Sequence, residues 1–408
     1  MKNMIKTIVM CSALAATLSA CSETPQKEKV IVEINNTKSS EELTEAGEQL
    51  VAPYTLNLAY RAFEMALEKN PNDMKALFYQ KFLKRFMVLR GVGTNVKPIV
   101  QKYGNISQYE NEVKKAPAYP IKKFLMTPEK SAPIKSESGI QNIFIEYRKA
   151  LVEFRQFIAH NPDLTLDLRM NPYVFQAQIN DRLEQNCVIV EDGENSKYEC
   201  DLDGAATVRL NIADLMVLKQ EAAAEILYVT LYASYNLDGF IDYAKAIEGK
   251  GVTAQQATDV ILEKVNLSVL DKEGLKSIKS IATDMLVAVK WVQKYSDKLC
   301  PNPAGDTRRK GHLIENGSIF CVRHNAEFDN EMAKIEQAIN GAITVNVADG
   351  STTSIDAMAF FNNPVSSLKQ LAPAKWSTDG QSVESFQDNT MGGVFVNGDA
   401  VKVLNGNK

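Results

Sequence analysis

The side chains most used in catalysis are scarce in this chain, and they lie in no familiar arrangement. It has three histidines, His160, His312 and His324. None belongs to an H-E-x-x-H zinc motif, and the chain has neither a G-x-S-x-G nucleophile motif nor a glycine-rich phosphate loop. His160 stands at the end of a predicted helix, where an imidazole can bind helix carbonyls and interact favourably with the helix dipole. The sequence therefore predicts no catalytic residue set and no cofactor.

Two polar segments carry oxygen-bearing side chains at the first positions of a calcium-binding EF-hand loop. One begins at Glu199 and the other at Ser234. Such a loop needs a bidentate glutamate at its last position. The residues found there are Leu210 and Lys245. We therefore expect polar turns at both places and no metal site.

The amino terminus has the build of an export signal. Two lysines, Lys2 and Lys6, precede an uncharged, mostly apolar run from Thr7 to Ser19. A basic start followed by a short apolar run is typical of a signal peptide. The run is too short for a membrane-spanning helix, which needs about 20 apolar residues. We therefore expect residues 1–20 to form a signal peptide that is removed.

The residues that close this segment, Leu18-Ser19-Ala20-Cys21, resemble the lipobox of bacterial lipoproteins. The resemblance implies that the signal is cut before Cys21 and that this cysteine carries acyl chains that hold the protein to a membrane. Ser22 replaces the aspartate that, in lipoproteins similar to those of enteric bacteria, retains the protein in the inner membrane. The resemblance thus implies a cell-envelope protein anchored in the outer membrane, with its body facing the periplasm or, as the alternative, exposed at the cell surface.

Four cysteines remain once Cys11 leaves with the signal and Cys21 is lipidated. An even set in an oxidising compartment predicts two disulfides. Of three possible pairings we favour the local ones, Cys187–Cys200 and Cys300–Cys321. The first pair flanks a predicted β-hairpin with Asp192-Gly193 at its turn. A zinc site is disfavoured because no C-x-x-C spacing is present.

The segment 40–73 resembles one unit of a tetratricopeptide repeat. In the second helix of such a unit, small residues let two helices approach, an aromatic ring fills the space between them and a proline ends the helix. The pattern A-x3-F-x2-A-x4-P is met by Ala59, Phe63, Ala66 and Pro71. A partial match recurs at Ala150, Phe154, Phe157 and Pro162, out of step with a regular repeat. Either a degenerate repeat or two well-packed helical hairpins fits this pattern.

The remaining pattern predicts a mainly α-helical body of helical hairpins, with one disulfide-bridged β-hairpin. Apolar residues recur at helical spacing over 74–90, 212–235, 254–265, 275–295 and 328–339. Five prolines between residues 91 and 138 predict a long irregular loop rich in proline and lysine. We divide the mature chain into a tether over 21–39, a helical domain over 40–300 and a loop-rich C-terminal region over 301–408 with short strands.

Composition limits the function further. The chain is 45% hydrophobic and 24% charged, which is ordinary for a globular protein, and its formal net charge is −4. A mildly acidic chain lacks the basic surface that nucleic acid requires, so no nucleic-acid partner is expected.

The repeat-like motif and tether favour a non-enzymatic protein that binds or scaffolds another envelope protein through a helical groove. The alternative is a periplasmic lipoprotein enzyme or small-molecule-binding protein whose site forms only in space.

Overall fold

The computed structural model of the chain is mainly helical, with small antiparallel strand pairs, as the sequence predicts. It describes residues 29–51, 55–103, 107, 109–111, 124–126, 133–170, 187–191, 196–201, 206–210, 212–299, 326–347 and 350–405. Residues 1–20, predicted as a signal peptide, and Cys21, the predicted lipidation site, lie outside these ranges.

The first helices form a hairpin with a closely packed contact. Helix α2 (Ser40–Gln49) begins at a capping box, in which Ser39 and Glu42 satisfy each other's backbone N–H groups. Helix α3 (Leu56–Lys69) lies against it. A Cβ atom on Gly47 of α2 would stand 2.5 Å from the Phe63 ring of α3, so only glycine allows this approach. The next helix, α4 (Met74–Leu89), starts at the Asp73 cap and packs on α3.

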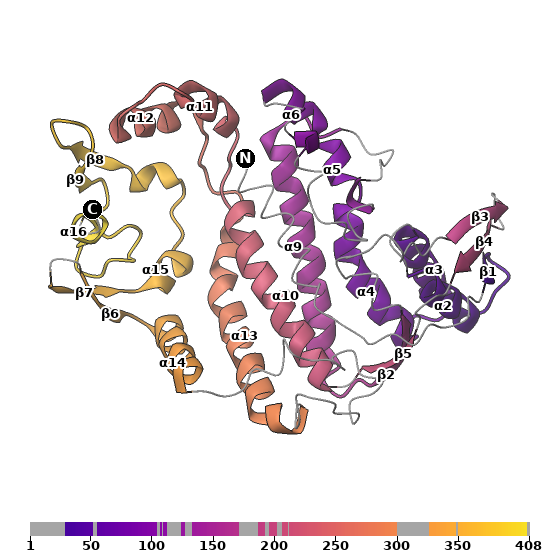
Figure 1. Cartoon of the computed structure of the whole chain (residues 1–408). Helices are drawn as coiled ribbons and strands as arrows, with labels where there is room; N and C mark the ends of the chain where they lie inside the picture. The colour runs from indigo at the N-terminus through magenta and orange to yellow at the C-terminus, as the bar shows by residue number, and fades with distance from the viewer. Residues whose placement is uncertain are drawn as a thin grey trace.

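The long helices continue this row in chain order. Helix α9 (Glu137–His160) packs on α4, α10 (Ile212–Ala233) packs on α9, and α13 (Lys272–Leu299) packs on α10. Figure 1 shows α4, α9, α10 and α13 side by side. Because α10 has a neighbour on each side, it is apolar nearly all round, as a buried helix should be. One continuous core runs from α2 through α10 to the buried Ile281 of α13.

Two short helices occupy the start of the segment that we predicted as an irregular loop over 91–138. They are α5 (Val92–Asn95) and α6 (Lys97–Tyr103). Pro98 lies in the first turn of α6, where a helix needs no donor from that residue. Ile99 and Val100 are buried, so their packing outweighs the local signal for irregular chain.

Three strands form a sheet at the α2 end of the row, in the order β1-β4-β3. The predicted hairpin is confirmed as β3 (Cys187–Glu191) and β4 (Ser196–Asp201), which are antiparallel. Strand β1 (Lys29–Ile34) pairs with the other edge of β4. The segment 21–39 was predicted to be a tether, but from Lys29 onward it is part of the folded body. A further unpredicted pair joins β2 (Leu166–Met170) to β5 (Ala206–Leu210).

The C-terminal part packs on the far side of α13 (Figure 1). Between α10 and α13 lie α11 (Phe240–Ile247) and α12 (Ala254–Lys264). Phe360, Phe361 and Leu368 pack against a cluster that contains Tyr235 and Leu275. Short strands are present here, as predicted, in the pairs β6·β7 and β8·β9. The elements in chain order are α14 (Ala326–Asn340), β6 (Ile343–Asn346), β7 (Thr352–Ile355), α15 (Ala357–Asn362), η3 (Leu368–Leu371), β8 (Pro373–Trp376), β9 (Val383–Phe386) and α16 (Ala400–Asn405).

Candidate functional site

A charged side chain lies on the buried face of α4, inside the main core. Arg85 is 2% exposed, although its neighbours along this face are the aromatic residues Phe78, Phe82 and Phe86. Its guanidinium carbon lies 4.6 Å from the centre of the Phe82 ring and 4.9 Å from that of Phe86. Aromatic faces attract a cation and hold it away from water. The α4 sequence thus places one positive charge in an apolar environment.

Two glutamates one helical turn apart on α10 face this arginine. Arg85 Nη1 lies 3.6 Å from Glu221 Oε1 and 3.7 Å from Glu225 Oε1. From α9, the Tyr147 hydroxyl donates a hydrogen bond of 2.6 Å to Glu225 Oε2. Within the described residues, Arg85 Nε and Nη1 and Glu221 Oε1 have no hydrogen-bond partner. We call Arg85, Tyr147, Glu221 and Glu225 the central cluster; it joins α4, α9 and α10.

The central cluster has one carboxylate more than its single arginine can neutralise. Burial raises the pKa of Glu225 to about 7, and Arg85 and the Tyr147 hydrogen bond oppose this rise only in part. A carboxyl group with such a pKa can hold a proton near neutral pH. Glu225 is 5% exposed, so its carboxyl group contacts side chains of the neighbouring helices and is not accessible to a substrate in solution. The arrangement therefore links three helices around a carboxyl group that can take up a proton near neutral pH.

A second buried carboxylate, Glu48 of α2, has fuller compensation. Its Oε1 accepts hydrogen bonds from the Arg169 backbone N–H at 2.8 Å and the Tyr79 hydroxyl at 3.2 Å. Its Oε2 lies 3.3 Å from Lys75 Nζ. Burial raises the pKa of Glu48, and these three donors oppose only part of the rise. Glu48 thus connects α2, α4 and β2.

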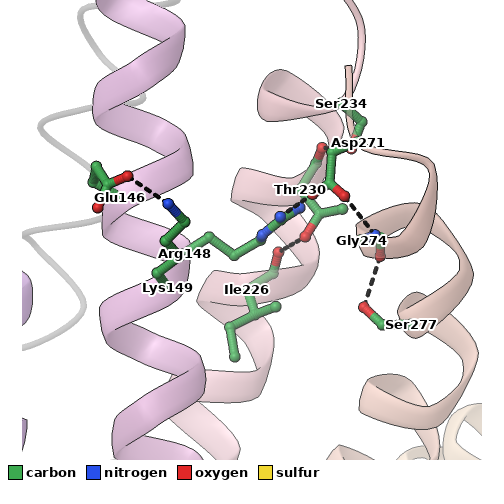
Figure 2. Close-up of polar contacts among 9 residues, drawn as sticks. All are labelled: Glu146, Arg148, Lys149, Ile226, Thr230, Ser234, Asp271, Gly274 and Ser277. Atoms are coloured by element: carbon green, nitrogen blue, oxygen red, sulfur yellow. Dashed lines mark hydrogen bonds and ion pairs between the residues drawn. The ribbon is translucent and has the colours of Figure 1, made fainter. Parts of the chain in front are cut away.

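Polar side chains also join α9 to α13 across the face of α10 (Figure 2). Arg148 of α9 forms an ion pair with Asp271, whose other oxygen caps α13 by accepting from Gly274 N at 2.8 Å. On α10, Thr230 Oγ1 donates to the Ile226 carbonyl at 2.7 Å, so this hydroxyl is satisfied within its own helix. Arg148 therefore holds the start of α13 beside α9.

The repeat-like residues lie in the α2–α3 hairpin. Ala59, Phe63 and Ala66 are fully buried, whereas Pro71 stands in the exposed turn before α4. The Phe63 ring stacks on Tyr79 of α4 with centroids 4.6 Å apart. These residues therefore pack three consecutive helices together.

The structure brings one of the two predicted cysteine pairs together. Cys187 of β3 stands opposite Cys200 of β4 in the strand register. The disulfide predicted across the β-hairpin is not supported, because no disulfide is found in the described part of the chain. Cys300 and Cys321 lie outside the described residues, as do His312 and His324.

The second polar segment, from Ser234, forms a turn as predicted, whereas the described residues of the first belong to strands β4 and β5. Asn236 accepts a hydrogen bond from the Asp238 N–H at 2.8 Å, and Gly239 then opens α11 with φ of 91°. This is a polar turn. Among the described residues, no group of three histidine, cysteine or acidic side chains could hold a metal ion. His160 Nδ1 lies 2.8 Å from the Gln156 carbonyl, at the helix end as expected.

An aromatic surface lies where α9 and α10 meet. The Tyr232 ring centre is 5.8 Å from that of Phe144 and 5.1 Å from that of Tyr228. These three rings are half-buried, and Leu231 beside them is 52% exposed. We call Phe144, Tyr228, Leu231 and Tyr232 the aromatic patch. Half-buried aromatic side chains beside an exposed leucine are typical of surfaces that contact other proteins.

The central cluster was missed at the level of sequence, although a signal was present. Glu221 and Glu225 are spaced one turn apart on a mostly apolar helix, and Arg85 falls at helical spacing with Phe78, Phe82 and Leu89. Charged residues on a buried face almost always have a partner. Pairing them required the order of the helices in space.

Comparisons with protein families, curated proteins and solved structures found no match to the chain. Across the described residues, no helix is both long enough and apolar enough to span a membrane.

Proposed function

We propose that this chain is a lipid-anchored cell-envelope protein that binds or scaffolds another envelope protein and is not an enzyme. The observation that carries the proposal is the row α2-α3-α4-α9-α10-α13, in which each helix packs on its neighbours in the chain. Proteins built as such rows offer extended surfaces to protein partners. Tetratricopeptide-like ancestry of the α2–α3 hairpin is part of this proposal.

The anchor rests on the amino-terminal sequence. The basic start, the short apolar run and Leu18-Ser19-Ala20-Cys21 together favour cleavage before Cys21 and acylation of that residue. Ser22 favours the outer membrane, with the body in the periplasm. Mass spectrometry of the amino-terminal peptide tests this: diacylglyceryl on Cys21 supports the anchor, and an unmodified Cys21 contradicts it.

The proposed contact with a protein partner is the aromatic patch. Replacing Leu231 with glutamate puts a charge into this surface at a half-exposed position, so the fold should tolerate it. Val287 on α13 is 59% exposed and provides the matched control, Val287→Glu. Both variants should keep the unfolding midpoint of the wild type.

The experiment is mild crosslinking in the native envelope, followed by purification of the anchored protein and mass spectrometry. We expect one recurrent protein to be captured by the wild type and by Val287→Glu, and to be lost with Leu231→Glu. Equal capture by all three would contradict a role for the aromatic patch. A co-purifying small molecule or glycan without a recurrent protein would contradict the scaffolding function.

Export would also bring Cys187 and Cys200, which lie opposite one another in β3 and β4, into an oxidising compartment where a disulfide can form. Opposite residues of antiparallel strands have Cα atoms about 4.5–5.5 Å apart, which lies within the range for disulfides. We propose that Cys187 and Cys200 transfer two electrons and two protons to an oxidising protein disulfide, which becomes a dithiol. A bridge between Cys300 and Cys321 remains a prediction.

Non-reducing digestion tests the first bridge. Protein from the envelope should yield the Cys187 and Cys200 peptides joined, whereas protein expressed in the cytosol without residues 1–20 should yield them separately. Free thiols at both positions in the envelope protein would contradict the bridge.

A further inference from the structure

Strand β1 fixes where the proposed anchor enters the folded body. Its first residue, Lys29, is eight residues after Cys21. Val30 pairs with Cys200 of β4, and β1 also contacts α2. The anchor therefore joins the protein at the end of the helix row that carries α2, β1, β3 and β4, which we call the sheet end.

The chain between the lipid and the sheet end is short relative to the body. Eight residues span at most about 29 Å when fully extended. Packed helices lie about 8–10 Å apart, so the four steps from α3 through α4, α9 and α10 to α13 cover roughly 32–40 Å. The C-terminal strands lie beyond α13, at the opposite end of the row from β1 (Figure 1). The link is thus shorter than the row of helices is wide.

The net charge of the chain does not favour an orientation in which the body lies flat on a bilayer. The chain carries a formal net charge of −4. Lipid surfaces that contain anionic headgroups attract basic segments and repel acidic ones. With one end held by a short link and no net attraction for the rest, the other end points into solvent.

We propose that the sheet end faces the lipid bilayer and that the strands β6–β9 with α16 stand away from it. This inference rests on the proposed acylation of Cys21. It deepens the proposed function because it orders the surfaces by distance from the membrane: the α9–α10 aromatic patch lies between the bound end and the free end, within reach of a second membrane-attached protein.

Two exposed asparagines provide matched positions for a test. Asn36 lies in the turn between β1 and α2, and Asn397 lies in the turn before α16. Each is replaced in turn by a bio-orthogonal amino acid that carries a donor fluorophore. The acylated full-length mature protein is then reconstituted into vesicles with an acceptor on the lipid headgroups. We expect clearly greater energy transfer from position 36 than from position 397.

A lengthened link sharpens the measurement. Inserting a flexible glycine-serine segment of on the order of twenty residues after Glu28 extends the reach. Energy transfer from position 36 should then fall toward the value at position 397. The insertion lies before β1, so the fold is unaffected.

The outcomes separate this inference from the proposed function. An unmodified Cys21 in the native protein would overturn both the anchor and the orientation. Acylation with equal transfer from the two positions, or with greater transfer from position 397, would overturn the orientation alone.

Discussion

Glu48 and Glu225 are both buried carboxylates at junctions of helices, and the two junctions are built differently. At the first, three donors from α4 and β2 meet one carboxylate, and one of them, Lys75, is partly exposed. At the second, one fully buried arginine faces two carboxylates, and Glu225 receives one hydrogen bond. The same side chain thus has three donors in one region, and in the other it shares a single cation with a second carboxylate. Burial raises the pKa of both groups; three donors oppose the rise at Glu48, whereas Glu225 has one hydrogen bond and shares one arginine with Glu221.

Removing the cation from the central cluster should have the largest effect. Arg85→Ala leaves Glu221 and Glu225 together without their positive partner, and breaking a buried ion pair in this way costs about 3–5 kcal/mol. Urea unfolding monitored by circular dichroism measures the loss.

A variant that removes all three charges provides the control. Arg85→Met combined with Glu221→Gln and Glu225→Gln should be much closer to the wild type, because well-packed neutral groups can replace a buried ion cluster. If Arg85→Ala alone is as stable as the wild type, the central cluster is not a junction of α4 and α10.

Deprotonation of Glu225 should be visible as a decrease in the free energy of unfolding as the pH rises. Its pKa is raised from 4.5 to about 7 in the folded protein, so the folded state binds the proton more tightly than the unfolded state. Stability from this group is therefore complete below pH 4.5 and is lost as the pH rises through about 7. The difference amounts to about 3 kcal/mol.

The measurement is the free energy of unfolding between pH 5 and pH 8 for the wild type and Glu225→Gln. The wild type should lose stability relative to the variant across this range. Parallel pH profiles would show that Glu225 does not titrate as described, and the contrast with Glu48 would disappear.

Gly47→Ala tests the close contact beside Glu48, in the first of the two regions. A Cβ atom would stand 2.5 Å from the Phe63 ring, which is itself stacked on Tyr79. Overpacking of this kind costs about 1–3 kcal/mol. Gly341→Ala is the matched control because a Cβ atom there meets nothing within 4 Å. Equal thermal unfolding midpoints for the two variants would contradict the packing of α2 on α3.

Glu48→Gln should have the smallest effect. The amide oxygen still accepts from the Arg169 N–H and from the Tyr79 hydroxyl, and only the ion pair with the partly exposed Lys75 is lost. Because Lys75 is partly exposed and can turn toward water, we expect a loss of about 1 kcal/mol. A loss as large as that of Arg85→Ala would show that Glu48 and Glu225 are held in the same way after all.

The sequence was informative where periodicity is strong and local. It predicted the long helices, the β3–β4 hairpin and the small residues that pack α2 on α3. It missed β2, β5 and the pairing of β1 with β4, since a strand whose partner is far along the chain has no local turn to mark it. The central cluster was missed for the same reason: Arg85 and Glu225 are brought together only by the packing of α4 and α10.

The pairing of β1 with β4 has a consequence for the newly made chain. Ribosomes deliver β1 first, and its partner follows only after α2, α3, α4 and α9 have been synthesised. At about 5–20 residues per second, β1 waits on the order of ten seconds with unpaired backbone groups. An unpaired strand with Val30, Ile31, Val32 and Ile34 is a template for aggregation. During this interval the strand therefore depends on contacts other than β4 to keep it from aggregating.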